Sequence, residues 1–385
     1  MITRQVVQCR SVAEVVAAIK HARQSGARLV PRGGGHCFTD RLSGADVVLD
    51  MTDLRSISVA GDVATVEAGA VLGEVYPALD GAGRALPAGC GPTVGITGLT
   101  LGGGIGLIGR AHGLTCDRLI GAQVVLADGT VADCDSAREP DLFWALRGAG
   151  GGHFAVVTKL HFETVPAAPI TRISAQWSPP DPELLAAAWQ AWAPEIPDNL
   201  TVNLTIGVRA GLVGASLLAV EPTRELVREL SDLAGYEIPF DLRGGMSLPE
   251  LKGSFNEPVQ QHHTRSEFFA RSLSDRVLTE LLDHQPGGRL SFTAMGGAYN
   301  RVGPDATAFA HRDERFLLQH VGTPGWVDTS WAIAHEDGSG RVYPNFPDPT
   351  LTDGPSAYHG ENLDRLRAVK QLYDPDRFFD FPQAL

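Results

Sequence analysis

The chain has 385 residues, 43% of them hydrophobic and 20% charged, and a formal net charge of −13 at pH 7. This composition is typical of a folded globular protein, and the length suits about two domains. An acidic chain lacks the basic stripe that binds nucleic-acid phosphates, and no apolar run of about eighteen residues is present to cross a membrane. We therefore expect neither a nucleic-acid nor a membrane partner.

Cysteine usage predicts a reduced protein. The sequence has five cysteines, an odd number, and none lies at the paired spacing of a zinc site. The adjacent pair His262-His263 has no carboxylate partner at ligand spacing, so it predicts no metal site either. The first ten residues, MITRQVVQCR, lack the apolar core of a secretory signal. We expect a cytoplasmic protein without a metal.

The first 166 residues predict short strands alternating with helices. Ser11 and Glu14 form a capping box before a run with helical spacing, and Gly26 ends that helix. The pair Asp128-Gly129 lies between two alternating runs and predicts a hairpin. The predicted strands are 5–9, 28–30, 47–49, 63–66, 123–126, 131–134 and 154–162, and the predicted helices are 71–79 and 140–146.

The pattern changes after the Pro- and Ala-rich residues 166–169, where we place a crossing between domains. Beyond this point, longer alternating runs predict antiparallel strands interleaved with amphipathic helices, which is an α+β arrangement. The predicted strands are 173–177, 201–208 and 213–220, and the predicted helices are 182–193, 221–233 and 361–372.

Two glycine-rich stretches are the most informative part of the sequence, LVPRGGGHCF at 29–38 and PAGCGPTVGITGLTLGGGIG at 87–106. Without Cβ atoms the backbone can take positive φ angles, and successive N–H groups can form an anion-binding concavity suited to a pyrophosphate. Neither stretch has the spacing of a Rossmann GxGxxG turn or of a P-loop. The glycines thus predict a cofactor cradle of another kind.

Several long motifs resemble one family. They are R-x-G-G-H at 32–36, P-T-V-G-x-x-G-x-x-x-G-G-G at 92–104, PDLFWALRGAGGGHFAVVT at 140–158, YPNFPD at 343–348, and YHGENLDRLRAVKQLYDPDRFFDFPQ at 358–383. Together they resemble the berberine-bridge-enzyme-like flavin oxidases, which share the vanillyl-alcohol-oxidase fold.

The resemblance implies an α+β fold, in which a two-subdomain PCMH-type FAD-binding domain carries an inserted α/β substrate domain built on an antiparallel sheet. Residues 1–166 would form the FAD-binding domain and residues 167–342 the substrate domain. The segment 343–385 would return to the FAD-binding domain.

The resemblance also implies a covalent cofactor. His36 matches the histidine that bonds to the flavin 8α-methyl carbon in the family. Many relatives carry a second link through a cysteine at the position of Gly91, whereas Cys90 lies one residue earlier and would face the opposite side of an extended segment. We expect one link, through His36, and Cys90 as a small buried residue. The residues expected at the cofactor are Arg32, Gly33, Gly34, Gly35, His36, Cys37, Cys90, Gly91, Thr93, Val94, Gly95, Gly98, Gly102, Gly103, Gly104, Gly106, Val156, Tyr358 and Asn362.

Catalysis would need a base that removes a hydroxyl or phenol proton while hydride leaves for the flavin. Tyr343 in YPNF matches a family tyrosine near the flavin ring, and Asn345 would hold a substrate oxygen or the flavin. A free tyrosine has a pKa of about 10, so its pKa would have to be lowered for work near neutral pH. A purely structural core tyrosine is an equally open interpretation.

The function that follows is two-electron oxidation of a C–H bond next to oxygen or nitrogen in a small molecule. Molecular oxygen would reoxidise FAD, and the family resemblance suggests natural-product biosynthesis as the setting. Two alternatives stay open at this point: a cyclase or isomerase that uses the flavin as a structural prop, and a non-catalytic flavin or ligand binder. The sequence indicates no oligomeric state.

Overall fold

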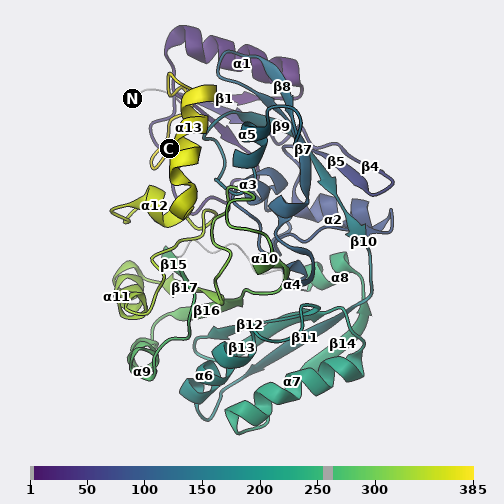
Figure 1. The fold of residues 1–385 in the computed structure, drawn as a ribbon, viewed down its shortest axis with the longest axis vertical. Helices are drawn as coiled ribbons and strands as arrows, with labels where there is room; N and C mark the ends of the chain where they lie inside the picture. Colours follow the sequence, from purple (N-terminus) through teal and green to yellow (C-terminus); the bar gives the residue numbers. More distant parts are fainter. Residues whose placement is uncertain (1–3, 255–262) are drawn as a thin grey trace.

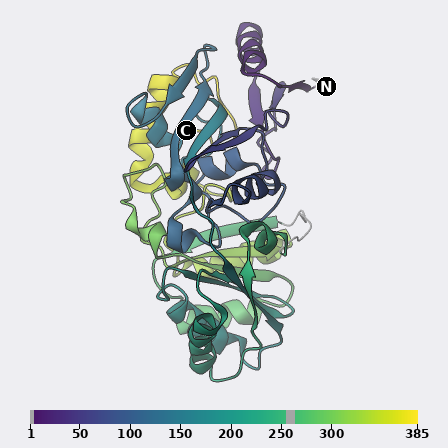
Figure 2. The ribbon, with the colours of Figure 1, turned by 90° about the vertical axis from the view of Figure 1, so that its right-hand side faces the viewer.

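The computed structural model describes residues 4–254 and 263–385. Two halves are stacked along the longest axis, with the N-terminal strands and the C-terminus in the upper half and a wide sheet in the lower half (Figure 1). A view turned by 90° keeps the same separation (Figure 2). Helices and mostly antiparallel sheets make up both halves, and the predicted α+β class is confirmed.

A three-stranded parallel sheet with the order β1-β3-β2 forms the top of the upper half. Helix α1 covers it with Val15, Ile19 and Ala22, and ends at Gly26, whose φ of 69° is left-handed as predicted. These elements are β1 (Gln5–Gln8), α1 (Val12–Ser25), β2 (Leu29–Arg32) and β3 (Val47–Asp50).

A five-stranded antiparallel sheet with the order β4-β5-β9-β7-β8 follows. The predicted hairpin is confirmed, because Val125 pairs with Val131 and Gly129 has a φ of 85°. Helices α2, α3 and α5 share one apolar core with this sheet. The elements are β4 (Ile57–Ala60), β5 (Val63–Glu67), α2 (Leu72–Asp80), α3 (Ile96–Leu101), β7 (Leu119–Val125), β8 (Val131–Cys134), α5 (Pro140–Ala145) and β9 (Val156–Glu163).

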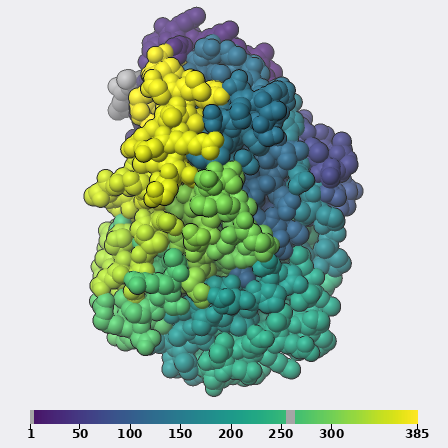
Figure 3. Space-filling model, in the orientation of Figure 1, coloured from purple at the N-terminus to yellow at the C-terminus, as the bar shows by residue number. Residues whose placement is uncertain are grey.

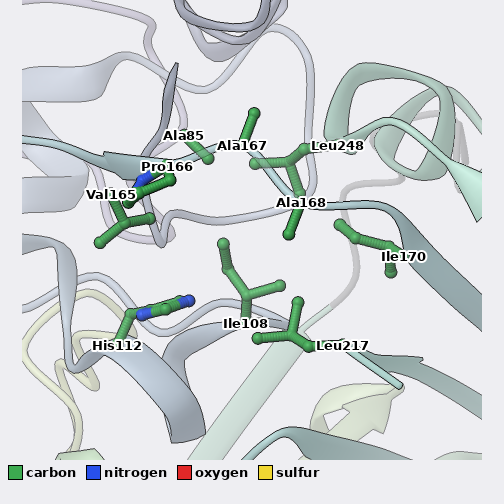
Figure 4. A pocket seen from close by; sticks show the side chains of 10 residues that line it. All are labelled: Ala85, Ile108, His112, Val165, Pro166, Ala167, Ala168, Ile170, Leu217 and Leu248. Carbon is green, nitrogen blue, oxygen red and sulfur yellow. The ribbon is translucent and has the colours of Figure 1, made fainter. Parts of the chain in front are cut away.

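The chain passes from one half to the other beside the proline-rich residues 166–169. Strand β10 (Val165–Pro166) pairs with β6 (Arg84–Ala85), and the first strand of the lower sheet begins at Ile170. A small apolar pocket lies at this crossing (Figure 4). Its walls are Ala85, Ile108, His112, Val165, Pro166, Ala167, Ala168, Ile170, Leu217 and Leu248.

The lower half is built on a seven-stranded antiparallel sheet with the order β14-β11-β13-β12-β16-β17-β15. Helices α6, α7, α9 and α11 cover one of its faces, where Leu185, Val227, Leu278 and Val327 join the apolar side chains of the strands. The elements are β11 (Ile170–Trp177), α6 (Pro182–Trp192), β12 (Leu200–Ile206), β13 (Ala210–Ser216), α7 (Val220–Ala234), β14 (Asp241–Met246), β15 (His263–Phe269), α9 (Asp275–His284), β16 (Arg289–Ala294), β17 (Phe316–Gly322) and α11 (Pro324–His335).

The C-terminal segment returns to the upper half. Helix α13 buries Leu363, Leu366 and Val369 in the core of the five-stranded sheet, and the yellow segment of Figure 3 lies against the blue part of the chain, which follows the purple N-terminal residues. On this arrangement we propose the domain division 1–166, 167–342 and 343–385. The remaining elements are α4 (Gly109–His112), η1 (Thr115–Arg118), α8 (Leu248–Gly253), α10 (Ala298–Arg301), α12 (Gly354–His359), η2 (Gly360–Asn362) and α13 (Leu363–Tyr373).

Local side-chain contacts shift two predicted features. The strand expected at 213–220 ends at Ser216, whose Oγ accepts the N–H of Leu218 and turns the chain, and Val220 already begins α7. The capping box of α1 is half formed, because Ser11 accepts the N–H of Glu14 while the Glu14 carboxylate accepts the N–H of Arg10 at 2.6 Å.

Candidate active site

The two glycine-rich stretches meet face to face. A Cβ atom on Gly95 would lie only 2.5 Å from the amide nitrogen of Gly34, and a Cβ on Gly34 would collide with the backbone of Thr93 and Gly95. Only glycine lets the two backbones approach so closely. The 29–38 and 87–106 stretches therefore form one unit, although 48 residues (39–86) separate them in the chain.

His36 lies at the rim of this unit. Its Nε2 lies 2.8 Å from the hydroxyl oxygen of Thr93, so the second glycine-rich stretch orients the imidazole that the first one carries. Partial burial lowers the pKa of His36, which favours the neutral ring. Among the described residues, nothing lies within 4 Å of where a Cβ on Gly35 or Gly98 would project, so bare backbone faces open space there.

This arrangement fits an FAD molecule. Bare glycine backbone can approach a pyrophosphate and a flavin ring, and the neutral imidazole has a nucleophilic nitrogen for the 8α-carbon. Cys37 is exposed beside His36. Gly33, Gly34, Gly35, His36, Thr93, Val94, Gly95 and Gly98 are the residues that would hold the group.

Arg32 points away from the cradle toward β3. Its guanidinium forms an ion pair with the buried carboxylate of Asp50. Burial pushes the Asp50 pKa upward, but hydrogen bonds from Arg32 and Thr52 outweigh burial, so the net pKa is lowered. This ion pair joins β2 to β3 directly before the glycine turn. Arg32 would therefore stabilise the fold of the cradle and would not contact FAD itself.

Three other residues expected at the cofactor have side chains committed to protein contacts. Val156 is buried in β9, where it pairs with Val125. The hydroxyl of Tyr358 accepts the N–H of Asp348 at 2.7 Å, and the amide of Asn362 donates to the carbonyl of Pro304 at 2.7 Å. These contacts fix the C-terminal segment, and a direct role at FAD stays a prediction.

The glycines from 102 to 106 make room for side chains of the protein. Asn345 lies against Gly102, Phe309 and the Tyr343 ring against Gly103, Thr115 against Gly104, and the backbone of Ala88 against Gly106. The YPNF segment is thereby docked on the second glycine-rich stretch. The sequence placed Tyr343 and Asn345 at the flavin only by resemblance, whereas the structure brings both onto the cradle.

Tyr343 occupies an unusual hydrogen-bonding position. Its buried oxygen accepts the N–H groups of Gly104 at 3.0 Å and Ile105 at 3.1 Å, and the amide of Asn345 at 3.0 Å. Burial raises the pKa of Tyr343 above its usual value of 10, and these three donors act against burial because they stabilise the ionised form. The Asn345 amide is itself fixed by the carbonyl of Leu99 at 2.8 Å.

Aromatic rings hold the Tyr343 ring in place. Its centroid lies 6.1 Å from that of Phe268, 6.2 Å from that of Phe309 and 5.0 Å from that of Phe346, each in edge contact. Sequence reasoning missed Phe268 and Phe309. Both lie in the weakly matching middle of the chain, and only the sheet register brings Phe268 to this place.

Cys90 is half-buried and contacts a residue that the sequence did not suggest. Lys252 of α8, itself 4% exposed, donates to the Cys90 thiol at 3.4 Å and to the carbonyl of Ala88 at 3.0 Å. Gly91, at the position of the second link in relatives, has Val94 packed against it. The side chain of Cys90 is thus directed to α8, whose Leu248 and Leu251 share the apolar core of the five-stranded sheet.

Replacing Cys90 by Ser is expected to leave flavin loading unchanged. A serine hydroxyl can still accept a hydrogen bond from the Lys252 ammonium. We therefore expect the free energy of unfolding to fall by less than the roughly 1–3 kcal/mol that an unsatisfied buried polar group costs. Thermal melting and the intact mass of the flavinylated chain measure both effects. A loss of covalently attached flavin would contradict the single-link prediction.

The described residues form neither a metal site nor a membrane-spanning helix. Within residues 4–254 and 263–385, no group of three His, Cys, Asp or Glu side chains could hold a metal ion. His262, part of the pair weighed above, lies outside the described residues. No helix in the described ranges is long and apolar enough to span a membrane. All five cysteines are free.

Comparison with known proteins identifies the family. The family model described as "FAD binding domain" matches residues 3–135, and the one described as "Berberine and berberine like" matches residues 342–385. The chain is 35% identical over 411 residues to an uncharacterised FAD-linked oxidoreductase, YgaK, of Bacillus subtilis (strain 168), with 99% of this chain and 90% of that protein covered. It is 30% identical to a glucooligosaccharide oxidase of Sarocladium strictum, with 96% and 84% covered.

Solved structures agree with these matches. The BBE-like 1 protein of Physcomitrella patens has a TM-score of 0.90 at 29% identity, with 98% of this chain and 90% of that chain covered. The glucooligosaccharide oxidase of Acremonium strictum, whose FAD is described as 6-S-cysteinyl and 8α-N1-histidyl, has a TM-score of 0.91 at 27% identity, with 98% and 90% covered. The chain belongs to the berberine-bridge-enzyme-like FAD-linked oxidoreductases and is an FAD-dependent enzyme of that family.

Proposed function

We propose that this enzyme oxidises a C–H bond next to oxygen or nitrogen, with Tyr343 as the base. The observation that carries the proposal is the buried Tyr343 oxygen, which accepts two backbone N–H groups of the glycine cradle and the side-chain amide of Asn345. Burial keeps the pKa of Tyr343 above its usual value rather than lowering it, but three donors to one phenol oxygen stabilise a phenolate more than a phenol and oppose that rise. A phenolate in this place would take the proton of a substrate hydroxyl.

The chemistry balances as a two-electron dehydrogenation. Bound FAD would supply the hydride acceptor, and molecular oxygen would take up the two electrons with two protons to give hydrogen peroxide. The substrate carbon gives up a hydride, its hydroxyl gives up a proton to Tyr343, and the C–O bond becomes a carbonyl. Asn345 would keep the Tyr343 oxygen oriented, since it contacts both that oxygen and Leu99.

The face of the lower sheet opposite its helices favours a substrate rich in hydroxyl groups. Alternate residues of the strands point away from the helices, and one transverse row of them runs across six strands in continuous register. At about 4.8 Å per strand, the row spans roughly 24 Å. Its members, all uncharged, are Gln176, Gly211, Thr205, Ser291, Gln319 and Ser266.

One end of this polar row, at β15 and β17, lies near Tyr343. Phe268 and Leu317, two residues along the same face from Ser266 and Gln319, share an apolar cluster with Tyr343. Neutral hydroxyl and amide groups suit a polyhydroxylated ligand, whereas an ionic substrate would call for a charged partner. We infer a neutral, hydroxyl-bearing substrate, in keeping with the names of the oligosaccharide oxidases among the relatives, and we retain natural-product biosynthesis as the setting.

Anaerobic mixing of the holoenzyme with candidate substrates tests the proposal. We expect maltotriose or cellotriose to bleach the flavin absorbance, and an apolar benzylic alcohol to bleach it at least tenfold more slowly. Product formation with a flavin that stays yellow would instead indicate a redox-neutral cyclase or isomerase. Spectral perturbation without product would indicate a binding protein, and either result would overturn the proposal.

A further inference from the structure

Strand β15 lies at the edge of the lower sheet and carries two charged residues on one face, Arg265 and Glu267. Both lie on the face covered by helices, opposite to Phe268, and Glu267 is only 1% exposed. A buried carboxylate is costly unless hydrogen bonds and charge compensate it. The partners of these two side chains must therefore compensate the burial of their charges.

The partners of Glu267 lie shortly before Tyr343 in the chain. One of its oxygens accepts the N–H of Gly340 at 2.7 Å, and both accept from Nδ1 of His335, at 2.8 and 3.0 Å. Burial raises the pKa of Glu267, and the bonds from His335 and Gly340 oppose that rise. Arg265 is the other charged group that acts on it.

The partner of Arg265 lies shortly after Tyr343 in the chain. Its guanidinium donates to the carboxylate of Asp348 at 2.7 Å, and Asp348 is 1% exposed. The guanidinium also stacks on the ring of Trp331 at 3.7 Å and lies 3.5 Å from the carboxylate of Asp328. Such a desolvated pair holds its geometry firmly, because breaking it leaves a buried charge.

The backbone of β15 completes the contact. The N–H of Phe268 donates to the carbonyl of Arg341 at 2.8 Å, and the N–H of Ser339 donates to the carbonyl of Phe268 at 3.1 Å. The Phe268 ring, on the other face of the strand, touches the ring of Tyr343. Strand β15 thus contacts residues 340–348 at Gly340, Arg341 and Asp348 through hydrogen bonds, and at Tyr343 through the Phe268 ring.

We propose that Glu267 and Arg265 are positioning residues that clamp the 340–348 segment and thereby set the Tyr343 oxygen against the N–H groups of Gly104 and Ile105. The inference rests on the proposed role of Tyr343 as base. Neither side chain contacts the Tyr343 oxygen, so both act through the backbone that carries it. A displacement of about 1 Å at a reacting group can lower the rate by about 100-fold, so contacts that fix the position of Tyr343 can affect the reaction rate.

Hydrogen exchange gives a readout that does not depend on turnover. In Glu267→Ala we expect the amides of peptides covering 338–346 and 103–106 to exchange at least tenfold faster than in the wild-type holoenzyme. Glu267→Gln, which restores an acceptor for the Gly340 N–H, should bring exchange back to within about threefold. The matched control is Asp374→Ala, which breaks the buried Lys370–Asp374 pair of the C-terminal segment and should leave these peptides unchanged.

A double-mutant cycle with Tyr343→Phe separates positioning from general damage. Glu267→Ala is expected to lower anaerobic flavin reduction about tenfold in the wild-type background and less than twofold in the Tyr343→Phe background. Equal falls in both backgrounds, or unchanged exchange at 338–346, would overturn the clamp and leave the base intact. An unchanged reduction rate in Tyr343→Phe alone would overturn the proposed base together with the clamp. Should Glu267→Ala fail to fold, Arg265→Lys, which keeps the charge but loses the planar fork, gives the same two readouts.

Discussion

Replacement of Tyr343 by Phe is expected to slow anaerobic flavin reduction by about 10²–10⁴-fold, the usual contribution of a positioned acid or base. The variant loses the proton acceptor but keeps the ring, which still packs against Phe268, Phe309 and Phe346. The amides of Gly104 and Ile105 lose their acceptor, so stability should fall by about 1–3 kcal/mol. Stopped-flow absorbance and thermal melting measure the two effects separately.

The pH dependence provides an independent check on Tyr343. A base works only when deprotonated, so the reduction rate of the wild type should rise tenfold per pH unit below the Tyr343 pKa. Because burial raises that pKa, the rise should continue into the alkaline range. The Phe variant should lack this limb. A rate limb of the same shape in both proteins would assign the base to another residue.

Replacement of His36 by Ala is expected to abolish covalent flavin attachment entirely. The warrant is the position of the neutral imidazole on the glycine cradle, with Gly91 at the second linkage position and Cys90 held by Lys252. After acid precipitation the wild-type pellet should be yellow and fluoresce in a denaturing gel. The His36→Ala pellet should be colourless, with its flavin in the supernatant.

The Cys90→Ala variant serves as the control for His36. It should keep the flavin in the pellet, and flavin attachment should add the same mass to this variant as to the wild type. Flavin that stays bound to denatured His36→Ala protein would reveal a link elsewhere in the chain. A wild-type pellet without colour would contradict the covalent bond through His36 and leave a tightly held but dissociable cofactor.

The parts of the fold that the sequence predicts are those encoded locally. The hairpin at Asp128-Gly129 follows from turn chemistry, and α1 follows from its spacing and from Gly26. Helix α13 was expected from residue 361, but the first turn is the 3-10 helix η2, and the α-helix starts at Leu363. Helix starts shift by a few residues in this way because the backbone geometry of a helix end is not encoded in the spacing of its apolar residues.

The functional contacts are the part that sequence reasoning could not reach. The Tyr343 oxygen meets amides some 239 residues earlier in the chain, and Lys252 meets Cys90 across 162 residues. Glu267 and Arg265 look like ordinary surface charges in the sequence, because alternation gives them the same pattern as solvent-facing strand residues. Only the register of the edge strand and the return of the C-terminal segment turn them into buried partners.

The order of segments along the chain also constrains how the protein can fold during synthesis. The core of the five-stranded sheet needs Leu363, Leu366 and Val369 of α13, so the upper half stays incomplete until α13 has left the ribosome. The lower sheet, by contrast, has all of its strands between residues 170 and 322. Domains generally form as units in order of synthesis. The lower half should therefore fold before the upper half is complete, and if the upper half holds FAD as proposed, flavin incorporation would follow the synthesis of α13.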